Sequence, residues 1–247
     1  MKLLYALIAS IIVSLVSFVG ILVVLIKENL LEKIKIVLIA LGAGGLIGGA
    51  FVHLLPEALE KSGDPDVSLL FLLMGFVLFF FLERFLFWRH CHKGKCDIHV
   101  FTYLNLIGDG VHNFIDGLII GGAFFVDIHF GIITTAAITM HEIPQELGDF
   151  GVLVYGGYSV KKALILNFFT ALTAIAGTFF GYFFSNSNEL FLMGLLPFAA
   201  GGFIYVAACD LIPALHKEQD KRISLLNMAM FLIGIFLMYG TKIVFGH

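Results

Sequence analysis

Long apolar stretches dominate the chain, and short polar links separate them. Charged and turn-forming residues mark the clearest breaks, at 27–29, 61–66, 89–97 and 185–189. An apolar run of about 20 residues is enough to cross the hydrocarbon core of a bilayer as a helix. The pattern therefore predicts eight membrane-spanning helices, at residues 3–26, 35–59, 67–88, 101–125, 129–156, 161–184, 190–215 and 223–245.

The first apolar run follows a lysine, as the core of a secretory signal peptide would. It extends from Leu3 to Ile26, and at 1.5 Å per residue it makes about 36 Å of helix. The apolar core of a cleaved signal is only about 7–15 residues long. We therefore expect this run to be retained as the first membrane span.

The composition agrees with a membrane protein and argues against other classes. Apolar residues make up 60% of the 247-residue chain and charged residues 13%, with a mean hydropathy of +1.00. An ordinary soluble domain is about 45–50% apolar, and a soluble chain of this length could not bury the excess. The net charge of −3 comes without a basic arm or patch, so we expect no nucleic-acid partner. Three cysteines do not make a disulfide framework.

Lysine and arginine are distributed unevenly between the two sides of the predicted bundle. The links after the first, third, fifth and seventh spans face one side and hold 12 of the 15 basic residues. These are Lys27, Lys33, Lys35, Arg84, Arg89, Lys93, Lys95, Lys161, Lys162, Lys217, Lys221 and Arg222. The other side has Lys2, Lys61 and Lys242. Because basic residues favour the cytoplasmic side, both termini are expected outside.

The second and seventh predicted spans share a pattern at an offset of 157 residues. Both contain Ala-Gly-Gly, at 43–45 and 200–202, followed by a proline 11 residues later. His53 and Asp210 occupy equivalent positions before the proline. Since the two spans cross in opposite directions, we predict an inverted repeat, in which helices 1–3 and 6–8 surround helices 4 and 5. Transporters often bind their substrate at such an interface; the alternative is two packing helices rich in small residues.

The fourth predicted span carries polar side chains where hydrocarbon is expected. Asn105, Asp109, His112 and Asp116 are spaced by four, three and four residues, so they form one stripe along three helical turns. Asn113 lies about 100° further around the helix than His112. Ionisable groups at this depth cost several kcal/mol each unless they face one another, water or a bound ion.

The fifth predicted span carries a second group of polar side chains. Its members are His141, Glu142, Gln145, Glu146 and Asp149. Pro144 removes a helical hydrogen bond among them and frees the carbonyl of Met140, which is a further potential ligand. Imidazole and carboxylate together suit Zn²⁺ and tolerate Fe²⁺, Mn²⁺ and Cd²⁺. We therefore predict a divalent-metal site between the fourth and fifth spans.

A polar network that only joins the two helices is the alternative interpretation of these groups. Hydrogen bonds between helices in a bilayer average about 0.6 kcal/mol. About eight polar or ionisable side chains crowd the two spans, and a network of that size would add little stability for its cost of burial. Metal coordination accounts for them better.

Further polar residues outline a route for the ion on either side of this site. His53 and Glu57, one helical turn apart near the outer end of the second span, are predicted entrance ligands. Asp109 lies on the stripe of the fourth span, and Asp210 lies near the inner end of the seventh, on a predicted exit route. The alternative for His53 and Glu57 is a pair that reaches toward the membrane interface.

The link between the third and fourth spans is rich in metal-binding residues and falls on the cytoplasmic side. It contains His90, Cys91, His92, Cys96 and His99. Under reducing conditions the thiols stay free as ligands, so the link could capture a metal that leaves the pore. Its spacing matches no standard zinc knuckle, and its cations repel a dication. The alternative is a basic loop that only sets orientation.

The motifs of the fourth and fifth spans resemble those of the ZIP (Zrt-, Irt-like) family of divalent-metal transporters. The resemblance is carried by His112-Asn113-x-x-Asp116-Gly117 and by His141-Glu142-x-Pro144-Gln145-Glu146-x-Gly148-Asp149-Phe150. His53-x-x-Pro56-Glu57-Ala58 and Asp210-x-x-Pro213 also fit the family pattern, so the similarity covers essentially the whole chain. It implies eight helices, extracellular termini and metal movement toward the cytoplasm.

The resemblance also implies which residues hold the metal. The implied site is made by His112, Asp116, His141, Glu142 and Gln145, with Asn113 at its edge and Glu146 beside it. Some members carry His or Glu at the position of Gln145, so the neutral carboxamide here lowers the charge of the site. Some complete a second, adjacent site with a glutamate in the sixth helix, where this chain has Thr173. We therefore expect one tightly held metal and a weak second site.

We thus expect a single all-α domain over residues 1–247 that transports divalent metal, zinc foremost, across the plasma membrane into the cytoplasm. Its partners would be the ion, the bilayer and a second copy in a homodimer, which the glycine-rich helices permit. The alternative function is an intramembrane zinc hydrolase with Glu142 or Glu146 as the base. That alternative is weaker because Gln145 stands where an HExxH motif requires its second histidine.

Overall fold

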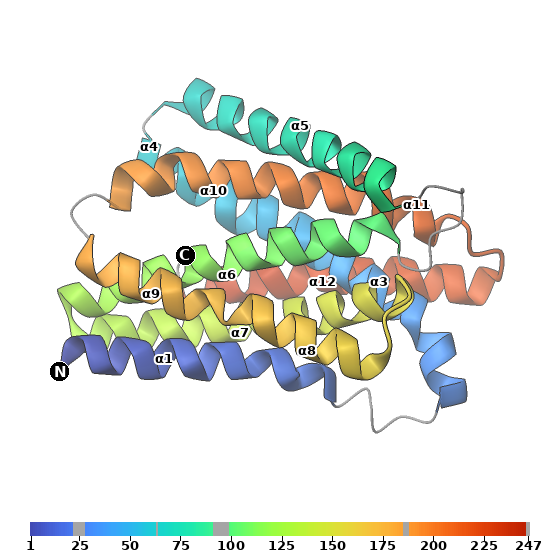
Figure 1. Ribbon diagram of the computed structural model, residues 1–247, viewed down its shortest axis with the longest axis horizontal. Helices are drawn as coiled ribbons and strands as arrows, with labels where there is room; N and C mark the ends of the chain where they lie inside the picture. Colours follow the sequence, from blue (N-terminus) through green and yellow to red (C-terminus); the bar gives the residue numbers. More distant parts are fainter. Residues whose placement is uncertain (22–27, 63, 91–98, 185–187, 246–247) are drawn as a thin grey trace.

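A computed structural model describes residues 1–21, 28–62, 64–90, 99–184 and 188–245, and the regular structure in these ranges is helical (Figure 1). The elements are α1 (Lys2–Val16) with η1 (Ser17–Gly20), α3 (Glu28–Gly48) with η2 (Gly49–Leu54) and α4 (Leu55–Ser62), α5 (Pro65–His90), α6 (Val100–Val126), α7 (Ile128–Tyr155), α8 (Val160–Ala171) with α9 (Thr173–Phe183), α10 (Asn188–Tyr205) with η3 (Val206–Leu211) and α11 (Ile212–Leu215), and α12 (Lys221–Phe245). These elements form eight long rods, which confirms the predicted all-α membrane fold.

Six of the eight rods are long and apolar enough to cross a membrane, judged by length and composition. They are Lys2–Gly20, Lys35–Glu60, Pro65–Phe85, Val160–Phe183, Gly194–Leu215 and Lys221–Val244. The other two, α6 and α7, have 27 and 28 residues, which is about 40 Å of helix each. They run alongside the apolar rods and carry the polar groups predicted to bind metal, which makes them less apolar.

The outer surfaces of the rods are apolar, as the membrane requires. Phe81 on α5 and Phe236 on α12 are more than 60% exposed, and other large apolar side chains of these helices are exposed as well. Polar side chains are concentrated inside instead, on the facing sides of α6 and α7. The helices therefore expose apolar side chains and bury polar ones, which is the reverse of the pattern in a soluble helical bundle.

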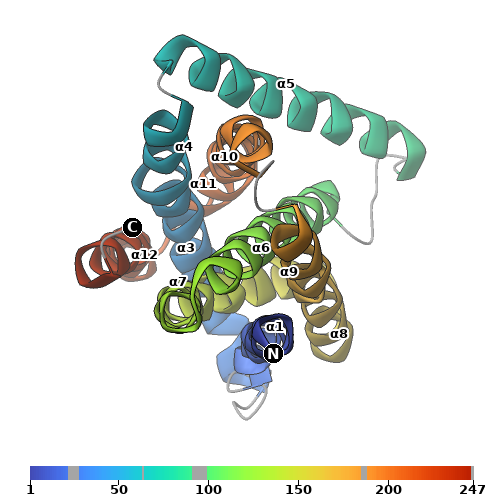
Figure 2. The same cartoon turned by 90° about the vertical axis from the view of Figure 1, so that its left-hand side faces the viewer.

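Seen from one end, the rods form two groups (Figure 2). One group contains α1, α6, α7 and the α8–α9 rod, and the other contains α3–α4, α5, α10–α11 and α12. Backbones approach closely within each group: a Cβ added to Gly117 of α6 would clash with the carbonyl oxygen of Ala174 on α9, and one on Gly75 of α5 would clash with that of Phe198 on α10. Glycine therefore permits these helix pairs to pack backbone against backbone.

The two groups meet where α3 crosses α7. A Cβ added to Gly42 would lie 3.1 Å from the Cα of Gly148, and a Cβ on Gly148 would clash with the Cα of Gly42. Leu38, one turn before Gly42, packs in the same way against Gly151. This contact brings the second group against the helix that carries His141 and Glu142.

Two π-helical segments interrupt the rods at equivalent positions. They cover Gly49–Leu54 and Val206–Leu211, and their bounds differ by 157 residues at both ends, which is the offset of the sequence repeat. The π turns precede Pro56 and Pro213, and such turns often occur at functional sites. In the first copy, Pro56 cannot donate to the carbonyl of Val52, and the Nζ of Lys242 donates to it instead at 3.1 Å. The shared irregularity supports the predicted inverted repeat.

The N-terminus of α7 and that of α8 are each capped by the side chain of the residue just before the helix. The carboxylate of Asp127 accepts hydrogen bonds from the backbone N–H groups of His129 and Phe130, at 2.8 and 3.2 Å. These two bonds lower the pKa of the exposed Asp127 carboxyl. Ser159 caps α8 by accepting from the N–H of Lys162. The caps fix where α7 begins and therefore the register of its polar side chains against α6.

Candidate metal centre

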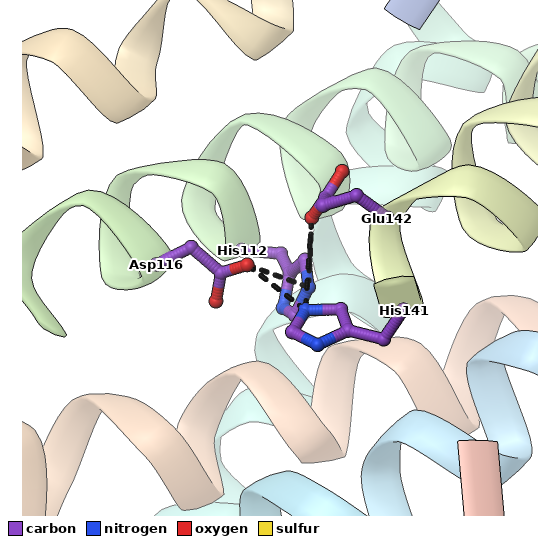
Figure 3. A group of neighbouring side chains, drawn as sticks. All are labelled: His112, Asp116, His141 and Glu142. Carbon is purple, nitrogen blue, oxygen red and sulfur yellow. Dashed lines mark hydrogen bonds and ion pairs between the residues drawn. The ribbon is translucent and has the colours of Figure 1, made fainter. Parts of the chain in front are cut away.

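The centre is built where α6 and α7 lie side by side. His112 and Asp116 are one turn apart on α6, and His141 and Glu142 are consecutive on α7 (Figure 3). His112, Asp116 and Glu142 are at most 3% exposed, and the side chain of His141 is 12% exposed. The four side chains therefore meet inside the protein, away from lipid.

Short distances connect the two helices through these four side chains. The Nε2 of His141 lies 2.9 Å from Oδ2 of Asp116 and 3.9 Å from Oε1 of Glu142. The Nε2 of His112 lies 3.3 Å from the same Glu142 oxygen and 3.7 Å from the same Asp116 oxygen. Each imidazole thus faces both carboxylates, and the four ligand atoms lie within 4.8 Å of one another.

This geometry fits a divalent metal. In a tetrahedral zinc site with bonds of about 2.0–2.1 Å, neighbouring ligand atoms are about 3.3 Å apart, which falls inside the observed range of 2.9–3.9 Å. Both ring nitrogens of His112 and both carboxylate oxygens of Glu142 are buried without a protein hydrogen-bond partner. Two carboxylates also balance the charge of a dication. A metal would satisfy these atoms, whereas a purely structural network leaves them unsatisfied.

The family model described as "ZIP Zinc transporter" matches residues 1–96 and 89–242. The chain belongs to the ZIP zinc transporter family. The family is one of transporters and not of enzymes, which agrees with the predicted class and leaves no support for the hydrolase alternative.

Curated ZIP relatives match most of the chain. It is 30% identical to the zinc transporter zipt-7.2 of Caenorhabditis elegans over 95% of its own length and 64% of that relative. It is 34% identical to the zinc transporter ZIP13 of Pongo abelii, over 81% of the chain and 65% of the relative. A shorter region, 51% of the chain, is 43% identical to the zinc transporter ZIP4 of Homo sapiens, of which it covers 19%. The chain thus spans slightly less than two thirds of the length of the first two relatives.

Three further residues were predicted to bind the metal in this ZIP protein, and they lie near the centre. Gln145 is buried, and its Nε2 has no hydrogen-bond partner. Asn113 donates to Oδ1 of Asp109 at 2.8 Å. Glu146 accepts a short hydrogen bond from Asn167 of α8. Asn113 and Glu146 are therefore held by the neighbouring side chains of Asp109 and Asn167.

Asn167 was not predicted as part of the centre. It is 0% exposed in the interior of α8 and bonds both the side chain and the backbone carbonyl of Glu146. In the sequence it is the one carboxamide within the predicted span 161–184. Thr173, where some ZIP members have an acidic residue, donates to the carbonyl of Gly110 at 2.7 Å, so its hydroxyl serves helix packing.

Of the predicted route residues outside α6, His53 has a measured contact to the centre. The ring of His53 lies 5.4 Å from that of His141, measured between centroids, and its Nε2 is 2.9 Å from the carbonyl oxygen of Met238 and 3.0 Å from the hydroxyl of Thr241. Glu57 follows one turn later on α4 and is partly buried. Asp210 lies in η3, and its Oδ2 is buried without a hydrogen-bond partner. His53 is therefore next to the centre, whereas Asp210 belongs to the equivalent π turn of the second repeat.

The histidine- and cysteine-containing link between α5 and α6 is only partly described. Cys91, His92 and Cys96 lie outside the described residues, as does the side chain of His90 at the end of α5. His99 is exposed just before α6, and its ring stacks on that of Phe101 at 5.3 Å between centroids. Metal capture by this link stays a prediction.

Proposed function

We propose that this protein transports a divalent metal ion, zinc foremost, across the membrane into the cytoplasm through the centre between α6 and α7. The observation that carries the proposal is the buried group of His112, Asp116, His141 and Glu142, whose ligand atoms lie within 4.8 Å. Relatives named as zinc transporters over most of the chain support it. Iron(II), manganese(II) and cadmium are the other candidate substrates because imidazole and carboxylate accept them too.

In this proposal, neighbouring residues complete the coordination as the ion moves. Gln145 adds a neutral carboxamide oxygen from the same face of α7 as His141, one turn away. Asn113 and Glu146 then receive the ion on the inward side. His53 and Glu57 lead to the centre from outside, and Asp109 and Asp210 line the way toward the cytoplasm. The cytoplasmic link with His90, Cys91, His92, Cys96 and His99 captures the released ion.

Alternating access requires the two helix groups to move relative to each other. The buried centre lies on the first group, whereas His53 and Asp210 lie on the second group in η2 and η3. The close contact of Gly42 with Gly148 joins the groups without bulky side chains. A shift at this contact would move the centre away from His53 and toward the inward side. Such a movement is expected of an inverted-repeat transporter.

Membrane location and assembly complete the proposal. The protein is an integral membrane protein, and we place it in the plasma membrane. The uneven distribution of basic residues supports both termini outside. Glycine-rich helix faces permit a homodimer. The zinc ion and the lipid bilayer are its other partners.

The test is metal uptake by the purified protein in liposomes, measured with zinc, iron(II), manganese(II) and cadmium. Wild-type protein is expected to take up zinc, and His112→Ala and His141→Ala are each expected to abolish uptake while the protein still inserts and stays monodisperse. Asp127→Asn is a matched control, because Asp127 is exposed at the start of α7 and asparagine is also a good helix cap. Near-normal uptake by both histidine variants would contradict the proposal.

A further inference from the structure

An open groove lies between α11 and the first turns of α12, at the end of the molecule where α8 also begins (Figure 1). It has a volume of about 270 Å³. Its walls are α11, the adjoining His216 and the turns of α12 that carry Ser224, Asn227, Met228, Phe231 and Leu232. No residue of the four-residue metal centre lines it. The groove is therefore a feature separate from the metal centre.

The polar side chains of this groove gather at one end. Ser224 and Asn227 lie on the first two turns of α12, and His216 lies just before that helix. Ser224, Met228 and Leu232 are spaced by four residues, so they follow one stripe along α12. Met228 and Leu232 are 62% and 50% exposed, and on a membrane-spanning rod such side chains face acyl chains. The groove thus runs from a polar end near the start of α12 to an apolar end deeper in the bilayer.

Asn227 is the most deeply buried polar side chain that lines the groove. It is 3% exposed, and neither its Nδ2 nor its Oδ1 has a hydrogen-bond partner among the described residues. A buried carboxamide that is left unpaired is costly, and its N–H group is a donor for phosphate or ester oxygens. Asn227 lies six residues, or about 9 Å of helix, beyond Lys221. With Lys221 among the lipid headgroups, Asn227 lies just below them, because each interfacial layer is about 5–8 Å thick.

Basic side chains flank the polar end of the groove. Lys217, Lys221 and Arg222 are exposed on the turn before α12 and at the start of that helix. Two acids lie on the same turn, and three cations against two acids leave a net charge of +1. Both acids bind the backbone of the turn itself: Oε1 of Glu218 accepts from the N–H of Asp220 at 2.8 Å, and Oδ1 of Asp220 accepts from the N–H of Arg222 at 2.7 Å. The basic side chains therefore dominate the charge at this end and favour an anionic ligand.

We infer that the groove binds one anionic phospholipid of the cytoplasmic leaflet. Its phosphate lies among Lys217, Lys221 and Arg222. Its ester region lies beside Asn227, and one acyl chain follows Met228 and the apolar stripe beyond it. Basic pockets between helices on the cytoplasmic side bind anionic headgroups in this way, and the inference rests on the proposed orientation, which puts this turn in the cytoplasm. Because α11 directly follows η3, the bound lipid stabilises the inner end of the proposed exit route.

Native mass spectrometry of the purified full-length protein, titrated with phosphatidylglycerol or with phosphatidylcholine of the same acyl chains, tests the site. We expect the first phosphatidylglycerol to bind at least about fivefold more tightly than phosphatidylcholine, because each basic residue near the headgroup contributes roughly that factor. Lys221→Gln together with Arg222→Gln is expected to abolish this preference. Lys161→Gln together with Lys162→Gln is the matched control, because it removes two cations at the start of α8, at the same end of the molecule but outside the groove. The control is expected to keep the preference of the wild type.

Met228→Trp tests the apolar half of the groove. The larger side chain fills the path of the acyl chain and keeps the three cations, so phosphatidylglycerol binding is expected to weaken about tenfold, for which the loss of about two buried methylene contacts is sufficient. Met228 is exposed, so the fold is retained, and the melting temperature without lipid checks this. Equal affinity of the wild type for the two lipids, an equal loss in the control pair, or displacement of phosphatidylglycerol by inorganic phosphate would overturn the inference. The measurement needs neither zinc nor a known orientation, so its failure is distinguishable from failure of the proposed transport.

Discussion

The Nε2 of His141 on α7 lies 2.9 Å from the Oδ2 of Asp116 on α6, and this contact joins the two helices that carry the buried His112, Asp116, His141 and Glu142. The same Asp116 oxygen lies 3.7 Å from the Nε2 of His112. One carboxylate oxygen therefore faces both imidazoles. In the proposed centre this acid serves as a metal ligand and also orients the two rings before the metal arrives.

Replacing Asp116 by asparagine keeps the shape of the side chain but removes its charge. We expect zinc affinity to fall at least about tenfold, because a neutral amide oxygen is a weaker ligand than a carboxylate. Zinc binding by calorimetry is the measurement, with Asp127→Asn as the control. Wild-type affinity in Asp116→Asn would mean that this acid is not a ligand.

The eight rods could be predicted from the sequence because an apolar run of sufficient length has no other stable environment than a membrane. The predicted boundaries that fall on described residues agree with the rods to within a few residues, except that α3 begins at Glu28 rather than near 35. The predicted end of the first span, at 26, lies outside the described residues. The position before each proline, shared by His53 and Asp210, also proved informative, since both residues lie in matching π segments.

The packing of the rods could not be predicted in the same way. Helices such as α5 and α12 are apolar on all sides, so their pattern does not say which face meets a neighbour. The pairing of Asn167 with Glu146 likewise joins α8 to α7, and a lone carboxamide in an apolar helix does not name its partner. The spacing of polar residues was sufficient to predict the site between α6 and α7 only because each of these two helices carries several potential ligands.

The contact between the two helix groups should tolerate little added volume. Gly148→Ala would push a methyl group into the backbone of Gly42, and we expect it to lower the free energy of unfolding by about 1–3 kcal/mol. Gly122→Ala on α6 is the control, because a Cβ there meets nothing within 4 Å. Thermal unfolding in detergent measures both. Equal melting temperatures for the two variants would contradict the close contact of α3 with α7.

His53 should influence how the ion reaches the centre rather than whether it binds there. Its Nε2 is held by the carbonyl of Met238 and the hydroxyl of Thr241, and its ring lies beside that of His141. We expect His53→Ala to raise the KM for zinc uptake severalfold and Thr241→Val to have a smaller effect in the same direction. An unchanged KM in His53→Ala would remove this residue from the route.

The orientation of the protein can be tested by labelling single cysteines in a variant without Cys91, Cys96 and Cys209. Cysteine at position 2 is expected to react with an impermeant reagent in intact cells, because the positive-inside rule puts the termini outside. Cysteine at position 161 is expected to react only after permeabilisation. The reverse pattern would invert the topology and the direction of the proposed transport.

The central claim is that one zinc ion binds between His112, Asp116, His141 and Glu142. Anomalous diffraction from crystals grown with zinc, recorded on both sides of the zinc absorption edge, tests it most directly. We expect a strong peak within about 2.0–2.2 Å of all four ligand atoms. Clear density for the four side chains with no anomalous peak among them, or with zinc bound only elsewhere, would contradict it.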